Sequence, residues 1–222
     1  MILSYLSHKK MKINDVGLTI LSTTSTIAYR DLVLGFQCKN NMILCSDDSY
    51  TSLEVNKAFD FIGDILLSGD VTQKYMNMIM KKYISSLDEV NRDKIMKAFY
   101  TLETTINDSL LLEELPLEID FCEDLKKMLK LTNLHLDHDL MKTPYAIIET
   151  VLRIHQECKI DSIPVICNVA NYLNNTQLKE LSELVKQLKL KVILIEFTDK
   201  NFNEILEKAE CAYIDQDLID WY

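Results

Sequence analysis

The sequence contains very little glycine and proline, with four Gly and three Pro in 222 residues. These two residues form most tight turns, so their scarcity excludes a sandwich or barrel built from many hairpins. No apolar stretch approaches the roughly 18 residues that a membrane-spanning helix needs. None of the six cysteines forms a C-x-x-C pair, which excludes a zinc ribbon and a thioredoxin-type motif.

Positive charge is also scarce, because 24 Lys and Arg stand against 34 Asp and Glu, for a net charge of −10. Such a chain attracts nucleic-acid phosphates only where its cations are clustered. The cysteines are scattered among apolar neighbours, as in proteins of a reducing compartment. The opening "MILSYLSHKKMKIND" lacks the pattern of a signal peptide. We therefore expect a cytoplasmic protein.

Apolar residues make up 48% of the chain, which is enough for a substantial core. Short apolar runs lie at residues 16–21, 42–45 and 58–67 near the N-terminus. In the last third, an apolar run at residues 162–169 and another at 191–197 flank an amphipathic helical pattern. Strand–helix–strand order with β-branched runs is typical of a parallel sheet covered by helices. The sequence thus predicts an α/β fold with a mostly parallel sheet.

The middle of the chain has a different pattern. From Thr72 to about Leu112 there is no Gly or Pro, and apolar residues recur every three or four positions. This spacing predicts at least two helices, broken near residues 85–88. We therefore expect a head domain formed by residues 1–70 and 115–222, and an α-helical leg domain at residues 71–114.

Motifs for nucleotide binding and for esterase chemistry are missing. The junction "DILLSGDVTQKY" at residues 64–75 follows an apolar run, yet it lacks the glycines and the Lys-Ser/Thr pair of a phosphate-binding loop. An ordinary capped helix start explains it better. No G-x-S-x-G elbow occurs, so an α/β-hydrolase is not supported.

An acidic segment, "LEIDFCEDLKK", occupies residues 117–127. In an extended conformation Glu118 and Asp120 point to one side, and Glu123 and Asp124 fall in the first turn of a following helix. Four carboxylates from two short elements suit Ca²⁺, which prefers several hard oxygen ligands in loose geometry. Acidic residues also gather at helix N-termini because of the helix dipole. From the residues alone, the metal site and the helix start remain equal alternatives.

Lysines follow the acidic segment directly. Lys126, Lys127 and Lys130 belong to its predicted helix, and Lys81 and Lys82 lie in the first middle helix. Solvated helix faces are the usual interpretation of such clusters.

The order and spacing of these elements resemble a known family: the small accessory protein of the spacer-acquisition module in type II-A CRISPR systems. The resemblance is clearest over residues 163–219, with a strand ending at Asn168, a helix, a strand ending at Glu196 and a final acidic strand. The segments "FIGDILLSGD" and "LPLEIDFCEDL" also have counterparts there.

This resemblance implies a head with a degenerate nucleotide-binding-like sheet and an inserted helical leg. It also implies a non-catalytic homotetrameric ring that binds Ca²⁺ and holds linear double-stranded DNA and its ends. The implied partners are the CRISPR integrase subunits and the RNA-guided effector nuclease of this antiviral defence.

Residue by residue, the resemblance assigns calcium to Glu118, Asp120 and Glu123, with Asp124 adjacent. Cys122 departs from the pattern, because some relatives carry an acid there. The DNA-facing lysines would be Lys126, Lys127, Lys130, Lys81 and Lys82. Two alternatives remain: a Mg²⁺-dependent nuclease that uses the same four carboxylates, and an NTPase-like interaction module that does not bind DNA.

Overall fold

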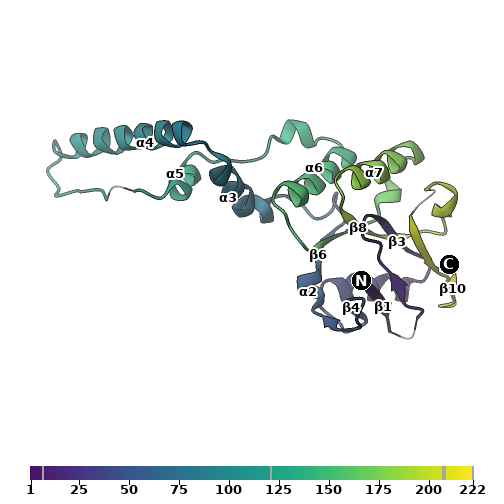
Figure 1. The fold of residues 1–222 in the computed structure, drawn as a ribbon. Coiled ribbons are helices and arrows are strands. Elements are labelled where there is room, and N and C mark those ends of the chain that lie inside the picture. The colour runs from purple at the N-terminus through teal and green to yellow at the C-terminus, as the bar shows by residue number, and fades with distance from the viewer. Residues whose placement is uncertain (7, 121, 207–208, 222) are drawn as a thin grey trace. The chain divides into compact units, whose positions relative to one another are not determined.

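The computed structural model describes residues 1–6, 8–120, 122–206 and 209–221. The chain forms two compact units (Figure 1). The head unit consists of Met1–Val71 and His138–Tyr222, and the leg unit consists of Thr72–Asp137. No described helix is long and apolar enough to cross a membrane.

The main sheet of the head has six strands. In spatial order they are β10 (Asp220–Trp221), β9 (Glu210–Ile214), β3 (Gly17–Thr23), β8 (Lys191–Phe197), β7 (Ile163–Cys167) and β6 (Phe59–Gly63). Five of them pair in parallel, and only β10 runs antiparallel to its neighbour β9. The predicted mostly parallel α/β fold with an added helical segment is therefore confirmed.

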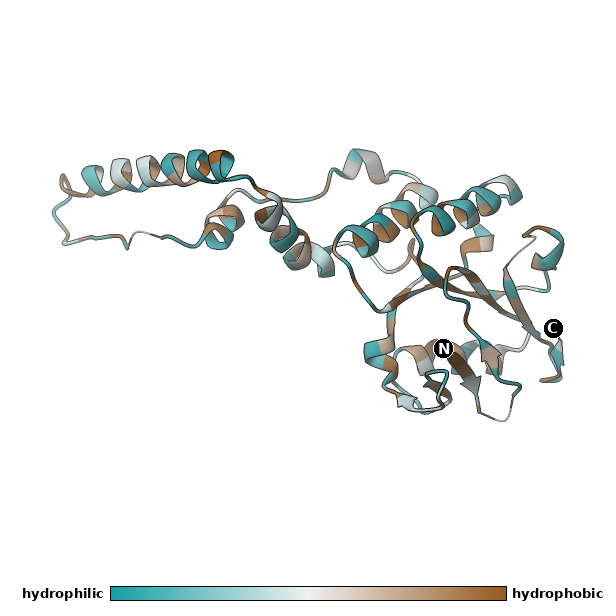
Figure 2. Cartoon of the chain, in the orientation of Figure 1, coloured by the Kyte–Doolittle hydropathy of each residue, from teal (hydrophilic) through white to brown (hydrophobic). Residues whose placement is uncertain are grey.

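The central strands are apolar because both faces of the sheet are covered. Every residue of β3 and β7 is buried, and so are the five residues in the middle of β8. Continuous Val, Ile and Leu runs are the expected pattern for such strands, whereas a strand with one wet face alternates apolar and polar residues. The brown strands of Figure 2 show this apolar interior.

Three helices of the head carry its larger amphipathic faces: α1 (Thr26–Phe36), α6 (Pro144–Glu157) and α7 (Asn175–Gln187). Helix α7 begins with a capping box, because the Asn174 side chain accepts the Gln177 N–H and the Gln177 side chain accepts the Asn174 N–H. A short helix, α2 (Val55–Ala58), precedes β6. In Figure 2, α7 shows alternating teal and brown because one face is buried.

A second, antiparallel sheet completes the head. Its strands in spatial order are β2 (Met11–Lys12), β1 (Ile2–Tyr5), β4 (Ile43–Ser46) and β5 (Ser52–Leu53). Leu3 and Ile43 of this sheet share a buried cluster with Phe36 of α1 and Phe59 of β6. The rings of Phe36 and Phe59 meet edge to face at 5.0 Å.

In its described residues the leg unit contains three α-helices: α3 (Met76–Ser86), α4 (Glu89–Leu110) and α5 (Leu125–Leu131). Its small core consists of Leu125, Met128 and Leu129 of α5. Residues of α3, α4 and their flanks pack around this core, namely Ile84, Leu87, Ile95, Met96, Phe99 and Cys122. Asp88 caps α4 by accepting the N–H of Asn91 at 2.8 Å.

The second boundary between the units lies after Asp137, whereas the sequence analysis placed it near residue 115. The reason is that α5 buries its apolar face against the helices of the leg. The expected extended segment also differs, because residues 117–120 form no strand.

Candidate functional site

All of the lysines and carboxylates that the sequence analysis selected lie in the leg unit. Lys81 and Lys82 are exposed on α3, and Lys127 and Lys130 are exposed on α5, where Lys126 is half-buried. Helices α3 and α5 contact each other. The fold therefore brings together two groups of lysines that are far apart in the sequence, through the shared apolar core beneath them.

The fold brings the two groups of lysines together, but it does not bring the four predicted calcium ligands together. Glu118, Asp120 and Glu123 are exposed and lie outside any helix or strand. In the described part of the chain, no group of three or more His, Cys, Asp and Glu side chains is placed to hold a metal ion. Carboxylate oxygens suit Ca²⁺, but one copy of this chain does not assemble these into a site.

Asp124 has a clear structural task. It is the N-cap of α5, and its Oδ1 accepts the backbone N–H of Lys126 at 2.9 Å. The helix-start interpretation therefore explains this carboxylate. Just before it, the backbone N–H of Cys122 donates to Glu103 Oε1 at 2.9 Å, which ties the acidic segment to α4.

A groove of about 700 Å³ lies in the leg unit beside this contact. It is lined by Met96, Lys97, Tyr100, Thr101, Glu103, Cys122, Glu123 and Met128. Methionine, tyrosine and cysteine side chains give it apolar walls, and charged residues stand among them. Glu123 is the only lining residue that the sequence analysis had selected. Lys97 and Glu103 were missed, because their spacing resembles that of any solvated helix face.

A second polar cluster lies in the head, where the parallel strands end. Asp64 follows β6, Asn168 follows β7, and Glu196 is the penultimate residue of β8. Neighbouring parallel strands bring their carboxyl ends to one edge, the usual ligand side of an α/β sheet. Asn168 Nδ2 donates to Asp64 Oδ2 at 3.2 Å, and the Tyr29 hydroxyl donates to Asn168 Oδ1 at 3.0 Å.

Glu196 is the most buried member of this cluster, with 1% of its surface exposed. Its two carboxylate oxygens accept the backbone N–H groups of Val169 and Ala170 at 2.9 and 3.1 Å. Burial raises the pKa of Glu196 to about 7, although these N–H groups and Lys200 act against the shift. The carboxylate thus fastens the turn after β7 to β8.

The connection between β3 and α1 is too short for a phosphate-binding loop. Only Thr24 and Ser25 connect β3 to α1, and the Ser25 hydroxyl accepts the Ala28 N–H as the helix cap. A loop of two residues without glycine cannot wrap a triphosphate. The head therefore has a mostly parallel sheet without a phosphate-binding loop after β3, and the polar cluster around Glu196 is hydrogen-bonded internally.

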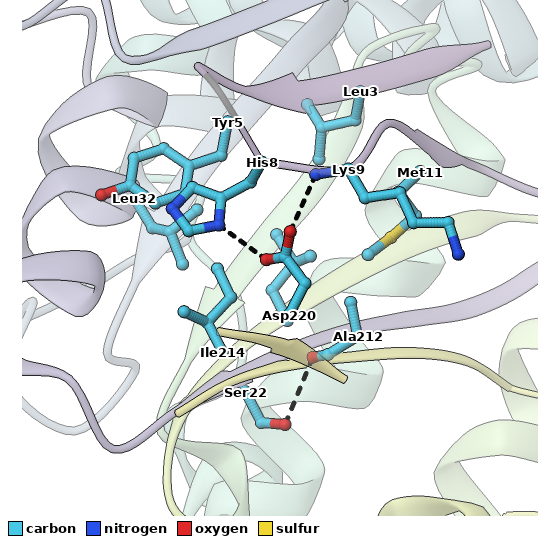
Figure 3. A pocket seen from close by; sticks show the side chains of 11 residues that line it. Leu3, Tyr5, His8, Lys9, Met11, Ser22, Leu32, Ala212, Ile214 and Asp220 are labelled. Atoms are coloured by element: carbon cyan, nitrogen blue, oxygen red, sulfur yellow. Dashed lines mark hydrogen bonds and ion pairs between the residues drawn. The ribbon is translucent and has the colours of Figure 1, made fainter. Parts of the chain in front are cut away.

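A small pocket in the head lies between the two sheets (Figure 3). His8 Nδ1 lies 2.6 Å from Asp220 Oδ1, and the backbone N–H of Lys9 donates to Asp220 Oδ2 at 3.0 Å. The Tyr5 ring stacks on His8 with centroids 4.6 Å apart.

This pocket has the room of about one water molecule, about 30 Å³, and its walls are mainly apolar. The Ser22 hydroxyl, which lines the pocket, donates to the Ala212 carbonyl at 3.3 Å (Figure 3). This serine is therefore already hydrogen-bonded within the protein. The His8–Asp220 pair therefore joins the connection between β1 and β2 to β10, and we assign it a structural role.

Comparisons with known proteins identify the fold. No protein-family model and no curated protein matches the chain. Among solved structures, the chain is similar to the crystal structure of Stu0660 of Streptococcus thermophilus, with a TM-score of 0.58 and 11% sequence identity. The match covers 100% of this chain and 76% of that one. Head and leg together therefore have the fold of Stu0660, and an identity this low shows the fold alone.

Proposed function

We propose that this chain is a non-catalytic double-stranded DNA-binding protein of CRISPR adaptation, the acquisition of new spacers. In this proposal it acts as a Ca²⁺-dependent homotetrameric ring that holds linear duplex and its ends in the cytoplasm. Its partners are the integrase subunits and the RNA-guided effector nuclease.

One observation carries the proposal: a helical unit with clustered lysines interrupts a parallel α/β unit that has no phosphate loop. This is the organisation that the sequence resemblance implies. The likeness of the whole chain to Stu0660 supports the same two-part architecture.

The lysines supply the chemistry for DNA. Lys81, Lys82, Lys127 and Lys130 present exposed ammonium groups on two contacting helices, with the half-buried Lys126 beside them. Ammonium groups of this kind bind phosphates without reading the bases, so binding would be salt-sensitive and independent of sequence. A chain of net charge −10 needs several copies to pool enough of these lysines around one duplex.

Calcium has a corresponding task in the proposal. It would neutralise Glu118, Asp120 and Glu123, whose exposed carboxylates would otherwise repel the duplex. Because one chain does not gather these side chains, ligands from more than one copy would share each ion. Asp124 would remain the helix cap.

The decisive experiment compares linear and closed circular duplex with Ca²⁺, Mg²⁺ or a chelator, and scores both retention and cleavage. We expect linear duplex to be retained in Ca²⁺ and released by chelator or by about 0.5 M salt, with no cleavage. Cleavage in Mg²⁺ would instead support the alternative, a metal-dependent nuclease that uses Glu118, Asp120, Glu123 and Asp124. A lack of retention in Ca²⁺ would contradict both DNA-binding functions.

A matched pair of variants locates the DNA surface. Lys127→Ala with Lys130→Ala should lower retention of linear duplex at least about tenfold, since two phosphate contacts are lost per chain. The control, Lys179→Ala on the exposed face of α7 in the head, should leave retention unchanged. Equal losses in both proteins would place the DNA surface elsewhere.

A further inference from the structure

Another pocket of the head lies where three parallel strands end. Its volume is about 270 Å³, roughly nine times the share of one water molecule in the liquid. It is lined by Ser22 of β3, Tyr213 of β9, Trp221 of β10 and residues 199–203, which follow β8. Ligands of parallel α/β sheets usually bind at this edge. The lysines and carboxylates of the proposed function lie in the leg unit, so this pocket belongs to a different unit.

The strand register brings three of these side chains into one row. Ser22 lies opposite Tyr213 in the pair of β3 with β9, and Tyr213 lies opposite Trp221 in the pair of β9 with β10. The side chains of directly opposed residues project from the same face of a sheet. The rings of Tyr213 and Trp221 are therefore neighbours on the face that lines the pocket.

The polar ends of both aromatic side chains are already occupied. The Trp221 Nε1–H donates to Asp215 Oδ2 at 2.9 Å, and the Tyr213 hydroxyl lies 2.9 Å from the Thr24 hydroxyl in a hydrogen bond. Trp221 is nevertheless 58% exposed. These two residues thus offer a ligand the faces of their rings, whose negative quadrupole attracts cations.

The connections that hold the pocket residues are acidic. Residues 198–206 and 215–219 carry four carboxylates and a single ammonium group, namely those of Asp199, Glu204, Asp215, Asp217 and Lys200. The N–H groups of Trp221 and Ile219 donate to Asp215 and lower its pKa, so this carboxyl is ionised at neutral pH. The local field therefore favours a cationic ligand over an anion such as phosphate.

Two charged side chains line the pocket itself, Asp199 and Lys200. The Asp199 carboxylate is exposed and forms no hydrogen bond or ion pair with the residues that the structure describes. Burial raises the pKa of Glu196 and the ammonium group of Lys200 acts against this shift, so the charge of Lys200 lies near that carboxyl. The pocket thus offers a ligand one unpaired carboxylate beside two aromatic rings.

We propose that this pocket binds the guanidinium group of an arginine side chain that a partner protein presents. The planar guanidinium can stack on the Trp221 indole and donate paired N–H bonds to the Asp199 carboxylate. Its alkyl stem would pack against apolar wall such as Phe202. An ammonium group is compact and strongly hydrated, so it matches this arrangement less well. Free arginine brings its own carboxylate, which the acidic connections would repel.

Trp221 is the only tryptophan in the sequence, so the tryptophan emission of the full chain reports on this pocket alone. The probe is a short peptide, acetylated and amidated, with one arginine among glycines. We expect its titration to change the emission until it saturates. The same peptide with citrulline keeps the shape without the charge and should bind at least about tenfold more weakly. The lysine peptide should bind at least about threefold more weakly.

Equal binding of the citrulline peptide would overturn the cation site, and equal binding of the lysine peptide would overturn the preference for guanidinium. Free arginine distinguishes the two sources of this group. It should bind more weakly than the blocked arginine peptide, and binding that is equal or tighter would overturn the assignment to a partner protein.

A matched pair of variants tests the carboxylate. Asp199→Asn keeps the shape of an exposed side chain and should weaken binding of the arginine peptide at least about fivefold. The control is Asp161→Asn, an exposed position just before β7, which should bind the peptide as the wild type does. Equal affinities in the two variants would overturn the role of Asp199.

This inference and the proposed function fail separately. Asp199→Asn should retain linear duplex like the wild type, because Asp199 lies outside the leg unit. A chain that binds the arginine peptide but not duplex contradicts the proposed function alone. A chain that retains duplex in Ca²⁺ but gives no saturable change in Trp221 emission contradicts this inference alone.

Discussion

The head and the leg differ in how much of their own surface they bury. Strand β3 in the head buries all seven of its residues, whereas helix α4 in the leg, three times as long, buries none. The head therefore has its own core and can be stable as a single copy. Among the described residues of the leg, only Thr72, Tyr75, Met80 and three side chains of α5 are buried, so the leg gains less stability from its own core than the head does.

The largest difference in the free energy of unfolding should appear when a leucine is replaced by alanine in the head and in the leg. Leu194→Ala in β8 removes a side chain with no exposed surface and should lower the free energy of unfolding by about 3 kcal/mol. Leu102→Ala in α4 should cost less than about 1 kcal/mol in the isolated chain. Urea unfolding at low protein concentration measures both. Equal losses would remove the contrast between head and leg.

The next effect depends on pH and belongs to the head alone. The pKa of Glu196 rises from 4.5 to about 7 on folding, so the folded chain holds one extra proton between these values. The free energy of unfolding should fall by about 3 kcal/mol as pH rises through this window. Below pH 4.5 the full contribution is present, and above pH 7 it is lost.

Glu196→Gln should flatten this part of the stability profile, because the amide keeps the shape of the side chain without its titration. Glu180→Gln on the exposed side of α7 is the control and should leave the slope unchanged. An identical slope in wild type and Glu196→Gln would show that another group is responsible. Urea unfolding between pH 4 and 8 gives the answer.

The smallest effect separates two tasks of one carboxylate in the leg. Asp124→Ala should lower the free energy of unfolding of the leg by about 1 kcal/mol, because the Lys126 N–H loses its acceptor. Asp124→Asn keeps the cap and should cost only a few tenths. Calorimetric titration with Ca²⁺ then completes the test. Unchanged binding in Asp124→Asn would agree with a helix cap, and lost binding would make this side chain a ligand.

Prediction from sequence worked where a single periodic signal determined the structure. The apolar runs that became β3, β7 and β8 are buried on both faces, so their composition alone identified them. Helix α7 was predicted equally well, from its amphipathic pattern. The short strands β1, β2 and β5 carry no such pattern. They form because β1 and β5 pair with β4, and β2 pairs with β1, beside the main core.

The candidate sites were harder, since they depend on which elements become neighbours. The lysine groups of α3 and α5 were visible in the sequence, but their contact follows from a small apolar core. For the acidic segment, periodicity suggested an extended Glu118 and Asp120, while the chain forms no strand there. The bonds of Glu196 to Val169 and Ala170 require the order of strands in the sheet, which local pattern does not contain.

The pairing of β3 has a consequence for how this protein is made. Residues 17–23 are synthesised well before both strands that flank them, at residues 191–197 and 210–214. At ordinary translation rates β3, whose seven residues are all buried in the folded head, waits on the order of ten seconds or more without its partners. The leg, by contrast, is one continuous segment and can form as it leaves the ribosome. A nascent chain should therefore have its whole leg segment in place while its head still lacks the partners of β3 and needs protection from aggregation.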